Sequence, residues 1–111
     1  MTQVITNVIA GLYDPYDYED LTADNTAGGV GLDTAKINPD GNIIGQAQRV
    51  VMTLETAAVR YTYDGTAPTT TLGHLLGAGD IVTLSGTQAI KQFRAIRTTG
   101  TSGVFRVTYE R

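Results

Sequence analysis

The sequence predicts an all-β protein, either a single small β-sandwich or a β-barrel, with an extended N-terminal arm. The chain has 111 residues, which is the usual size of one domain. From residue 49 onward, short segments of alternating apolar and polar residues recur about every eight to twelve residues, with turn residues between them. Such spacing is typical of sandwiches and barrels. The first 48 residues are interrupted by glycines and contain few alternating runs.

The second part of the chain predicts a series of short strands. They cover residues 49–55, 57–63, 72–76, 80–85, 93–97 and 104–110. A period of two places every second side chain on the same face, so one face of each strand can be buried. The side chains expected to share a core-facing side are Val50, Met52 and Leu54; Ala57, Val59, Tyr61 and Tyr63; and Phe105, Val107 and Tyr109.

The connections between these strands follow from shorter signals. Asp64, Gly65 and Pro68 form a turn motif, because Asp-Gly favours a positive φ and proline cannot donate a hydrogen bond to a strand ladder. Residues 87–92 are too few for a stable isolated helix and predict a turn or one helical loop. The small polar residues after Arg97 suggest that the last two strands are the arms of a hairpin.

Charge divides the chain into an acidic and a basic part. Residues 1–48 carry seven acidic residues and one lysine, a net charge of −6, and are predicted to form an extended arm with peripheral strands. Residues 49–111 carry seven basic and four acidic residues, a net charge of +3, and are predicted to form the sandwich core of the same domain. We hypothesise that the acidic arm docks on basic strands of its own domain or of a neighbouring subunit. The expected extended pieces of the arm are the apolar segments 4–12, 32–37 and 43–44.

A cluster of tyrosines and acids at residues 13–20 is the most distinctive local feature of the arm. It allows three interpretations: a solvated loop, which is favoured, a partner-binding segment with tyrosine anchors, or a Ca²⁺ site made of its carboxylates. Its spacing differs from that of a helix–loop–helix calcium loop, so we predict no metal site. The candidate protein-interaction residues are Tyr13, Asp14, Tyr16, Asp17 and Tyr18 in this cluster, and Arg60, Arg94, Arg97 and Arg106 on the strands.

Composition argues against several classes of function. The chain has no cysteine and a single histidine, His74, which excludes thiolate chemistry and His-rich metal sites. A small sandwich without long loops offers little room for a catalytic pocket, so we expect no enzyme activity, no catalytic residue and no cofactor, and a surface or hydrogen-bonded His74. An acidic chain without a basic cluster is a poor binder of nucleic acid. The longest apolar run, about five residues, is too short to cross a membrane.

Two stretches of the sequence resemble known proteins. Residues 59–69, with Asp-Gly-Thr-x-Pro-Thr after a strand, resemble the Ig-like modules at the C-terminus of chitobiase-type enzymes. Residues 58–109 resemble small structural proteins of tailed-bacteriophage virions, in a resemblance that covers about half of the chain. The segments that carry it include Gly73-His-Leu-Leu76, Leu84-Ser-Gly86 and Ile90-Lys-Gln-Phe-Arg-Ala-Ile-Arg97.

The second resemblance implies a non-enzymatic virion protein, most simply a capsid decoration (cement) protein. It implies the phage major capsid protein as partner, a homo-oligomer with a trimer favoured, and a place on the capsid surface after assembly in the host cytoplasm. The absence of cysteine fits assembly in a reducing compartment. The chitobiase-type motif implies the alternative, a carbohydrate- or surface-binding Ig-like module that acts as a head or tail adhesin. The lack of tryptophan disfavours this alternative.

Overall fold

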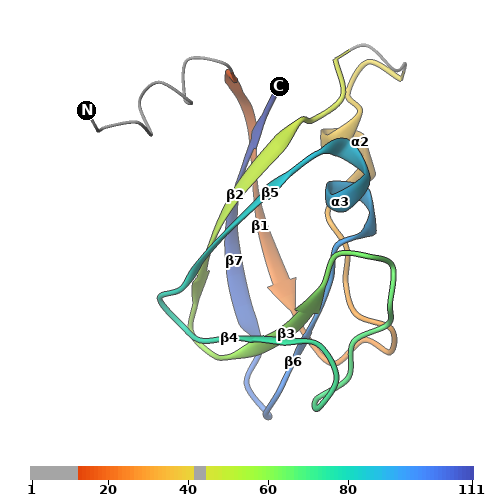
Figure 1. Ribbon diagram of the computed structural model, residues 1–111. Helices are drawn as coiled ribbons and strands as arrows, with labels where there is room; N and C mark the ends of the chain where they lie inside the picture. The colour runs from red at the N-terminus through yellow and green to blue at the C-terminus, as the bar shows by residue number, and fades with distance from the viewer. Residues whose placement is uncertain (1–12, 42–44) are drawn as a thin grey trace, which may run out of the picture.

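Two antiparallel β-sheets pack face to face in the computed structural model, which describes residues 13–41 and 45–111 (Figure 1). The larger sheet contains, in spatial order, β1 (Pro15–Ala23), β7 (Gly103–Glu110), β2 (Arg49–Glu55) and β5 (Ile81–Ser85). The smaller sheet contains β4 (His74–Leu76), β3 (Val59–Thr62) and β6 (Arg94–Arg97). The prediction of a small all-β sandwich is confirmed, and the described strands do not close into a barrel.

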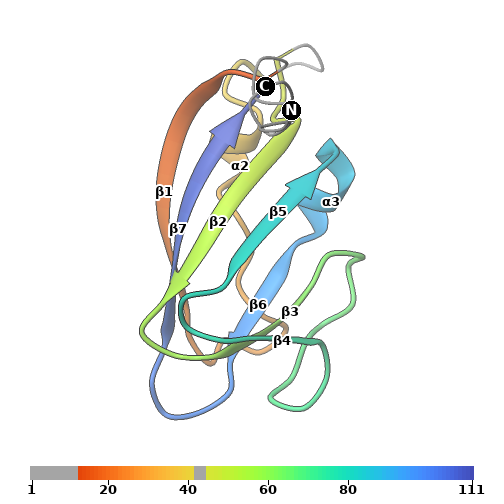
Figure 2. The same cartoon turned by 60° about the vertical axis from the view of Figure 1, so that its left-hand side comes forward.

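Two short helices lie side by side at one end of the sandwich (Figures 1 and 2). α2 (Thr34–Ile37) begins after Asp33, whose Oδ1 accepts a hydrogen bond from the Ala35 N–H at 2.9 Å and so caps the helix. The expectation of an extended segment at residues 32–37 is therefore wrong. α3 (Thr87–Gln92) agrees with the expected helical loop. No helix in the described part of the chain is long and apolar enough to cross a membrane.

The core lies between the sheets and is formed mainly by alternate residues of β2 and β7. The core-facing side chains that the structure confirms on these strands are Val50, Met52, Leu54, Phe105, Val107 and Tyr109, all fully buried. From the smaller sheet's side, Phe93 meets Phe105 edge-on, with ring centroids 5.6 Å apart and an interplanar angle of 84°. Each large side chain buried in this way contributes about 1.5–3 kcal/mol to stability.

The described residues of the acidic N-terminal part join this core. β1 pairs with β7 along its length, from Pro15 opposite Glu110 to Ala23 opposite Gly103. Within the segment 1–48, which the sequence predicts to be an arm with peripheral strands, the buried core side chains are Leu21, Ala23, Leu32, Ile37 and Ala47. The described part of this segment therefore supplies an edge strand, a helix and core residues to the sandwich. The expected extended pieces at residues 4–12 and 43–44 lie outside the described residues.

Two expectations about the strands from residue 49 onward are wrong. β6 and β7 do not form a hairpin, because β6 pairs with β3 in the smaller sheet while β7 lies between β1 and β2 in the larger one. The loop after Arg97 crosses from one sheet to the other, and small polar residues are as compatible with such a crossing as with a hairpin turn. Tyr63 does not face the core, because β3 ends at Thr62, whose Oγ1 donates to the Thr66 carbonyl oxygen at 2.5 Å. Tyr63 follows that end and is 47% exposed.

Candidate functional site

The acidic tyrosine cluster is a strand rather than a solvated loop, because from Pro15 onward it forms β1. Tyr16 packs against Tyr109, with ring centroids 6.3 Å apart, and its hydroxyl donates to the Lys36 carbonyl oxygen at 2.6 Å. Burial raises the pKa of Tyr16. Tyr18 is half exposed and points to solvent. The strand thus uses Tyr16 for packing and leaves Tyr18 on the surface.

The residues that enter β1 contact the ends of the central strands. The Arg49 guanidinium lies 4.7 Å from the centre of the Tyr13 ring, and that of Arg111 lies 4.4 Å from the Tyr16 ring. Both are cation–π geometries. Asp14 and Arg111 exchange two backbone hydrogen bonds, at 2.9 and 3.0 Å. Tyr13, Asp14 and Tyr16 therefore already have partners within the chain.

The carboxylates of β1 also pair within the chain. Asp17 lies 3.2 Å from the Lys36 ammonium, and Asp20 lies 2.9 Å from Arg106, which also contacts Glu55 at 3.2 Å. A backbone N–H and then Lys36 hold the pKa of Asp17 below its usual range. A tyrosine hydroxyl and then Arg106 do the same for the pKa of Asp20. Through Asp20, the acidic segment contacts a basic strand of its own domain, which is one of the two arrangements we hypothesised.

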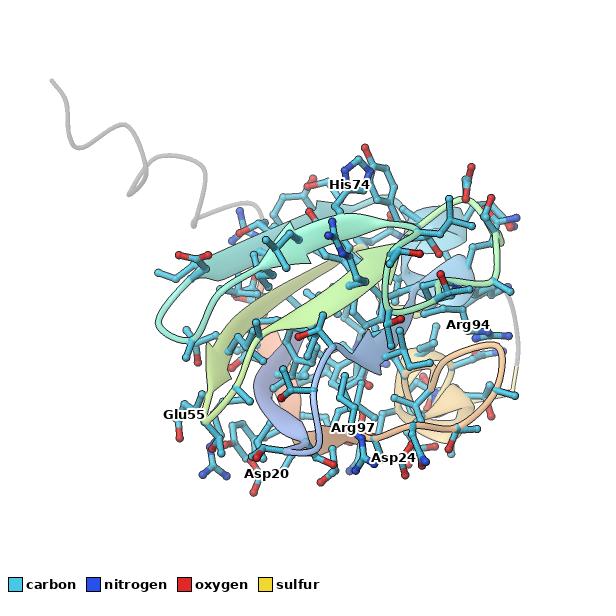
Figure 3. The ribbon with its side chains drawn as sticks, turned by 90° about the horizontal axis from the view of Figure 1, so that it is seen from below. Asp20, Asp24, Glu55, His74, Arg94 and Arg97 are labelled. Atoms are coloured by element: carbon cyan, nitrogen blue, oxygen red, sulfur yellow. The ribbon has the colours of Figure 1, made fainter. Side chains whose placement is uncertain are left out.

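The four candidate arginines do not form one basic stripe. Arg106 is on the larger sheet, whereas Arg60, Arg94 and Arg97 are on the smaller one. Figure 3 shows Arg97 beside Asp24 and well separated from Arg94. Arg60 and Arg94 each donate to a nearby backbone carbonyl oxygen at 3.2 Å. A large polyanionic partner would therefore meet scattered cations on the described surface rather than a continuous patch.

The turn motif is formed as the sequence indicates. The Asp64 carboxylate accepts the Thr66 N–H at 3.0 Å, which lowers the pKa of Asp64. Gly65 has a φ of 91°, which glycine adopts without strain. Pro68 is fully buried and anchors the end of the turn. The motif therefore stabilises the loop that follows β3 and positions Tyr63 at the start of it.

Three aromatic rings gather on the smaller sheet where β3 meets β4. We call Tyr61, Tyr63 and His74 the aromatic cluster. The register places Tyr61 opposite His74, with ring centroids 5.3 Å apart, and Tyr63 lies 5.9 Å from His74. Tyr61 also lies 5.9 Å from Phe93, so the rings continue from the core to the surface. Figure 3 shows His74 on the opposite side of the molecule from Asp24 and Arg97.

The aromatic cluster belongs to a larger apolar surface. Three large apolar side chains that line its two hollows are about half exposed or more, and we call them the apolar surface: Tyr63 47%, Leu72 51% and Ile81 65%. Two hollows open on either side of Tyr63. One, of about 260 Å³, is lined by Asp64, Thr66, Leu72 and His74 among others, and the second, of about 340 Å³, follows β5. Exposed apolar side chains gathered in this way are typical of binding surfaces.

The alternating pattern of the sequence does not indicate this surface. Alternation predicts that Tyr61 and Tyr63 both face the core, which only Tyr61 approaches, and His74 is expected to be a surface or hydrogen-bonded histidine. The signal that could have found it is the Tyr61-x-Tyr63 pair directly before a strong turn, since alternation is lost where a strand ends. The contact with His74 depends on the register of β3 and β4, which no local pattern shows.

Known proteins do not supply a function for this surface. Comparisons with protein-family models, with curated proteins and with solved structures give no significant match. Within residues 13–41 and 45–111, no group of three or more His, Asp or Glu side chains is placed to hold a metal ion. The candidate functional site is therefore the apolar surface with its aromatic cluster, and its chemistry suits contact with apolar and ring-shaped groups.

Proposed function

We propose that this protein is a non-enzymatic structural protein of a bacteriophage particle, a capsid decoration (cement) protein that binds the lattice of the major capsid protein. The resemblance of residues 58–109 to small virion proteins supports this proposal. The structural observation that carries it is the apolar surface, because Tyr63, Leu72 and Ile81 expose large side chains around neighbouring hollows on a small domain. A protein partner would remove this area from water.

The expected mechanism is the clamping of neighbouring capsid subunits. Burial of apolar area contributes about 25 cal/mol per Å², so a surface with three large side chains can bind a partner with modest strength. Many symmetry-related contacts on one shell turn modest individual affinities into strong overall attachment. A homo-oligomer on the capsid surface would multiply the contacts further.

The composition of the virus particle tests this proposal. Quantitative mass spectrometry of gradient-purified particles should find the protein in a fixed ratio to the major capsid protein. Its absence from purified particles would contradict the proposal. Added back to particles that lack it, the Leu72→Glu variant should bind more weakly than Thr22→Glu, a matched change at an exposed position on β1 away from the apolar surface. Equal binding of the two variants would show that the apolar surface is not the contact.

A second function, carbohydrate binding, is favoured by one observation. The aromatic cluster borders a hollow of about 260 Å³, which also carries the Asp64 carboxylate and the Thr66 hydroxyl. Sugars bind to aromatic rings flanked by hydrogen-bonding groups, and this hollow has both. A glycan array with the intact protein should then retain it, and Tyr63→Ala should abolish retention while Tyr18→Ala leaves it unchanged. Retention that is equal in both variants would exclude this hollow.

A further inference from the structure

The edges of the two sheets are unequally protected against pairing with another strand. Unprotected edges expose N–H and C=O groups that can pair with another chain. At the β1 edge, Pro15, a bulge between Pro15 and Asp17, and several carboxylates disfavour pairing. β4 is only three residues long. β6 is covered by Val30, which exchanges backbone hydrogen bonds with Ala95 at 2.8 and 3.0 Å.

β5 has none of these protections. Its sequence, Ile-Val-Thr-Leu-Ser, contains no charged residue and no proline. In an antiparallel pair, residues bonded to the neighbouring strand alternate with residues whose backbone groups point away. On either side of β5, the Leu54 N–H donates a hydrogen bond to the Asp80 carbonyl oxygen at 2.9 Å, and the Gly86 N–H donates one to the Gln48 carbonyl oxygen at 2.7 Å. By alternation, the N–H and C=O groups of the odd-numbered residues point away from β2. These residues are Ile81, Thr83 and Ser85.

A groove accompanies this open edge. The hollow of about 340 Å³ follows β5 from Ile81 to Ser85 and is bounded on its other side by Tyr61, Tyr63 and Ala89. Figure 2 shows β5 at the border of the larger sheet. Among the described residues no strand pairs with its outer edge. An added strand could therefore form backbone hydrogen bonds with β5 and place side chains against the two tyrosines.

We propose that this edge pairs with the same edge of a second copy of the chain. The two β5 strands would run antiparallel about a two-fold axis at Thr83, so that one self-complementary patch serves both copies. Thr83 would face its own counterpart, Ile81 would face Ser85 of the other copy, and Asp80 would face Gly86. Pairs of threonines across antiparallel strands are favourable. The two four-stranded sheets would then form one continuous sheet.

Charge selects β5 rather than β1 for this contact. Between two β5 strands no charged residue faces a like charge, because only Asp80 is charged near the pairing and it would lie opposite glycine. Two β1 strands would instead bring Asp17, Glu19 and Asp20 of both copies together, and like charges opposite one another are destabilising. The proposed dimer does not depend on the phage function, and its two-fold symmetry differs from the trimer that the resemblance implies.

Sedimentation of the intact chain tests the proposal first. Analytical ultracentrifugation over a concentration series should show a monomer–dimer equilibrium. Thr83→Lys places two lysines opposite each other on the axis and should raise the dissociation constant by at least about tenfold. Thr22→Lys makes the same change at an exposed position on β1 and should leave it unchanged. A monomer at all concentrations, a trimer, or equal effects of both variants would overturn the proposal, provided that circular dichroism shows both variants folded.

A cross-link tests the register of the pairing. The chain has no cysteine, so Thr83→Cys introduces a single thiol. At a hydrogen-bonded antiparallel pair the Cα atoms lie about 5.5 Å apart, within the range that a disulfide spans. With oxidised glutathione as oxidant, Thr83→Cys should form a covalent dimer several times faster than Thr22→Cys. Equal rates would refute the two-fold pairing at Thr83.

Discussion

Tyr109→Phe removes one hydrogen bond between the first and last strands of the larger sheet. Tyr109 is fully buried on β7, and its hydroxyl donates to Glu19 Oε1 on β1. Burial and this hydrogen bond raise the pKa of Tyr109, so the hydroxyl remains a proton donor under all ordinary conditions. The ring of phenylalanine preserves the contact with Tyr16, whose centroid lies 6.3 Å away. The substitution therefore changes the hydrogen bond and little else.

The expected cost follows from the surroundings of the Glu19 carboxylate. A hydrogen bond to a charged group contributes about 1.5–3 kcal/mol. Glu19 keeps a second donor, the Asp33 N–H at 3.3 Å, and is only partly buried, so part of its solvation is retained. We therefore expect the lower end of the range, a loss of about 1.5–2 kcal/mol in the free energy of unfolding. For a chain of this size this corresponds to a fall in Tm of roughly 6–8 °C.

Urea denaturation followed by circular dichroism measures this loss. The midpoint should fall while the m value stays constant, because the area exposed on unfolding does not change. Tyr18→Phe is the matched control, since Tyr18 also donates to a carboxylate, that of Asp20, but from an exposed position on β1. This control should lose far less stability than Tyr109→Phe, because water screens its exposed hydrogen bond. Equal losses in the two variants, or no loss in Tyr109→Phe, would refute the assignment of β1 to the stable core.

Three further predictions concern backbone strain, packing and pH. Thr56→Gly should raise the free energy of unfolding, measured in urea, by about 1 kcal/mol. Thr56 has a φ of 83°, and the strain that this causes in a β-branched residue exceeds the entropy that glycine adds to the unfolded chain. A lower free energy of unfolding would contradict this. Gly103→Ala should lower it by about 1–3 kcal/mol, since a Cβ there would lie 2.7 Å from both the Ala57 carbonyl oxygen and Val59 Cγ1; unchanged stability would show that the neighbours give way. The lowered pKa of Asp20 means that its carboxylate stabilises the fold fully above pH 3.8, its ordinary pKa, and that this contribution is lost as the pH falls further. In acid titrations followed by circular dichroism, Asp20→Asn should thus lose less stability below pH 3.8 than the original chain, and an identical pH dependence would contradict the contacts of Asp20 with Tyr18 and Arg106.

The strands with a clear local pattern were predictable from the sequence. In β2 and β7 an apolar residue stands at every second position, and burial on one face requires nothing else. The turn after β3 was equally predictable, because Gly65 and Asp64 satisfy the turn within a few residues. In these segments the residues that determine the local structure are neighbours in the sequence, so the sequence of the segment is enough to predict it.

Features that depend on distant partners were not predictable. The acidic side chains of β1 hide the pattern of a strand in the sequence. They are compatible with a strand only because Lys36 and Arg106, which are distant in the sequence, pair with Asp17 and Asp20. The false hairpin between the last two strands arose because a flexible polar loop is compatible with a tight turn and with a crossing between sheets. The aromatic cluster depends on the register of two strands that eleven residues separate, and so its three rings could not be linked from the sequence.

The position of β7 has a consequence for the time at which the protein can fold. β7 lies between β1 and β2, so the N-terminal edge strand has no partner in the larger sheet until β7 is present (Figure 2). During translation, β1 is made first, yet it must wait unpaired until residue 110 has left the ribosome. Pairings between residues so far apart along the chain also form slowly. The nascent chain is therefore expected to leave β1 unpaired until β7 has been made, and a ribosome-bound chaperone has access to this strand throughout that time.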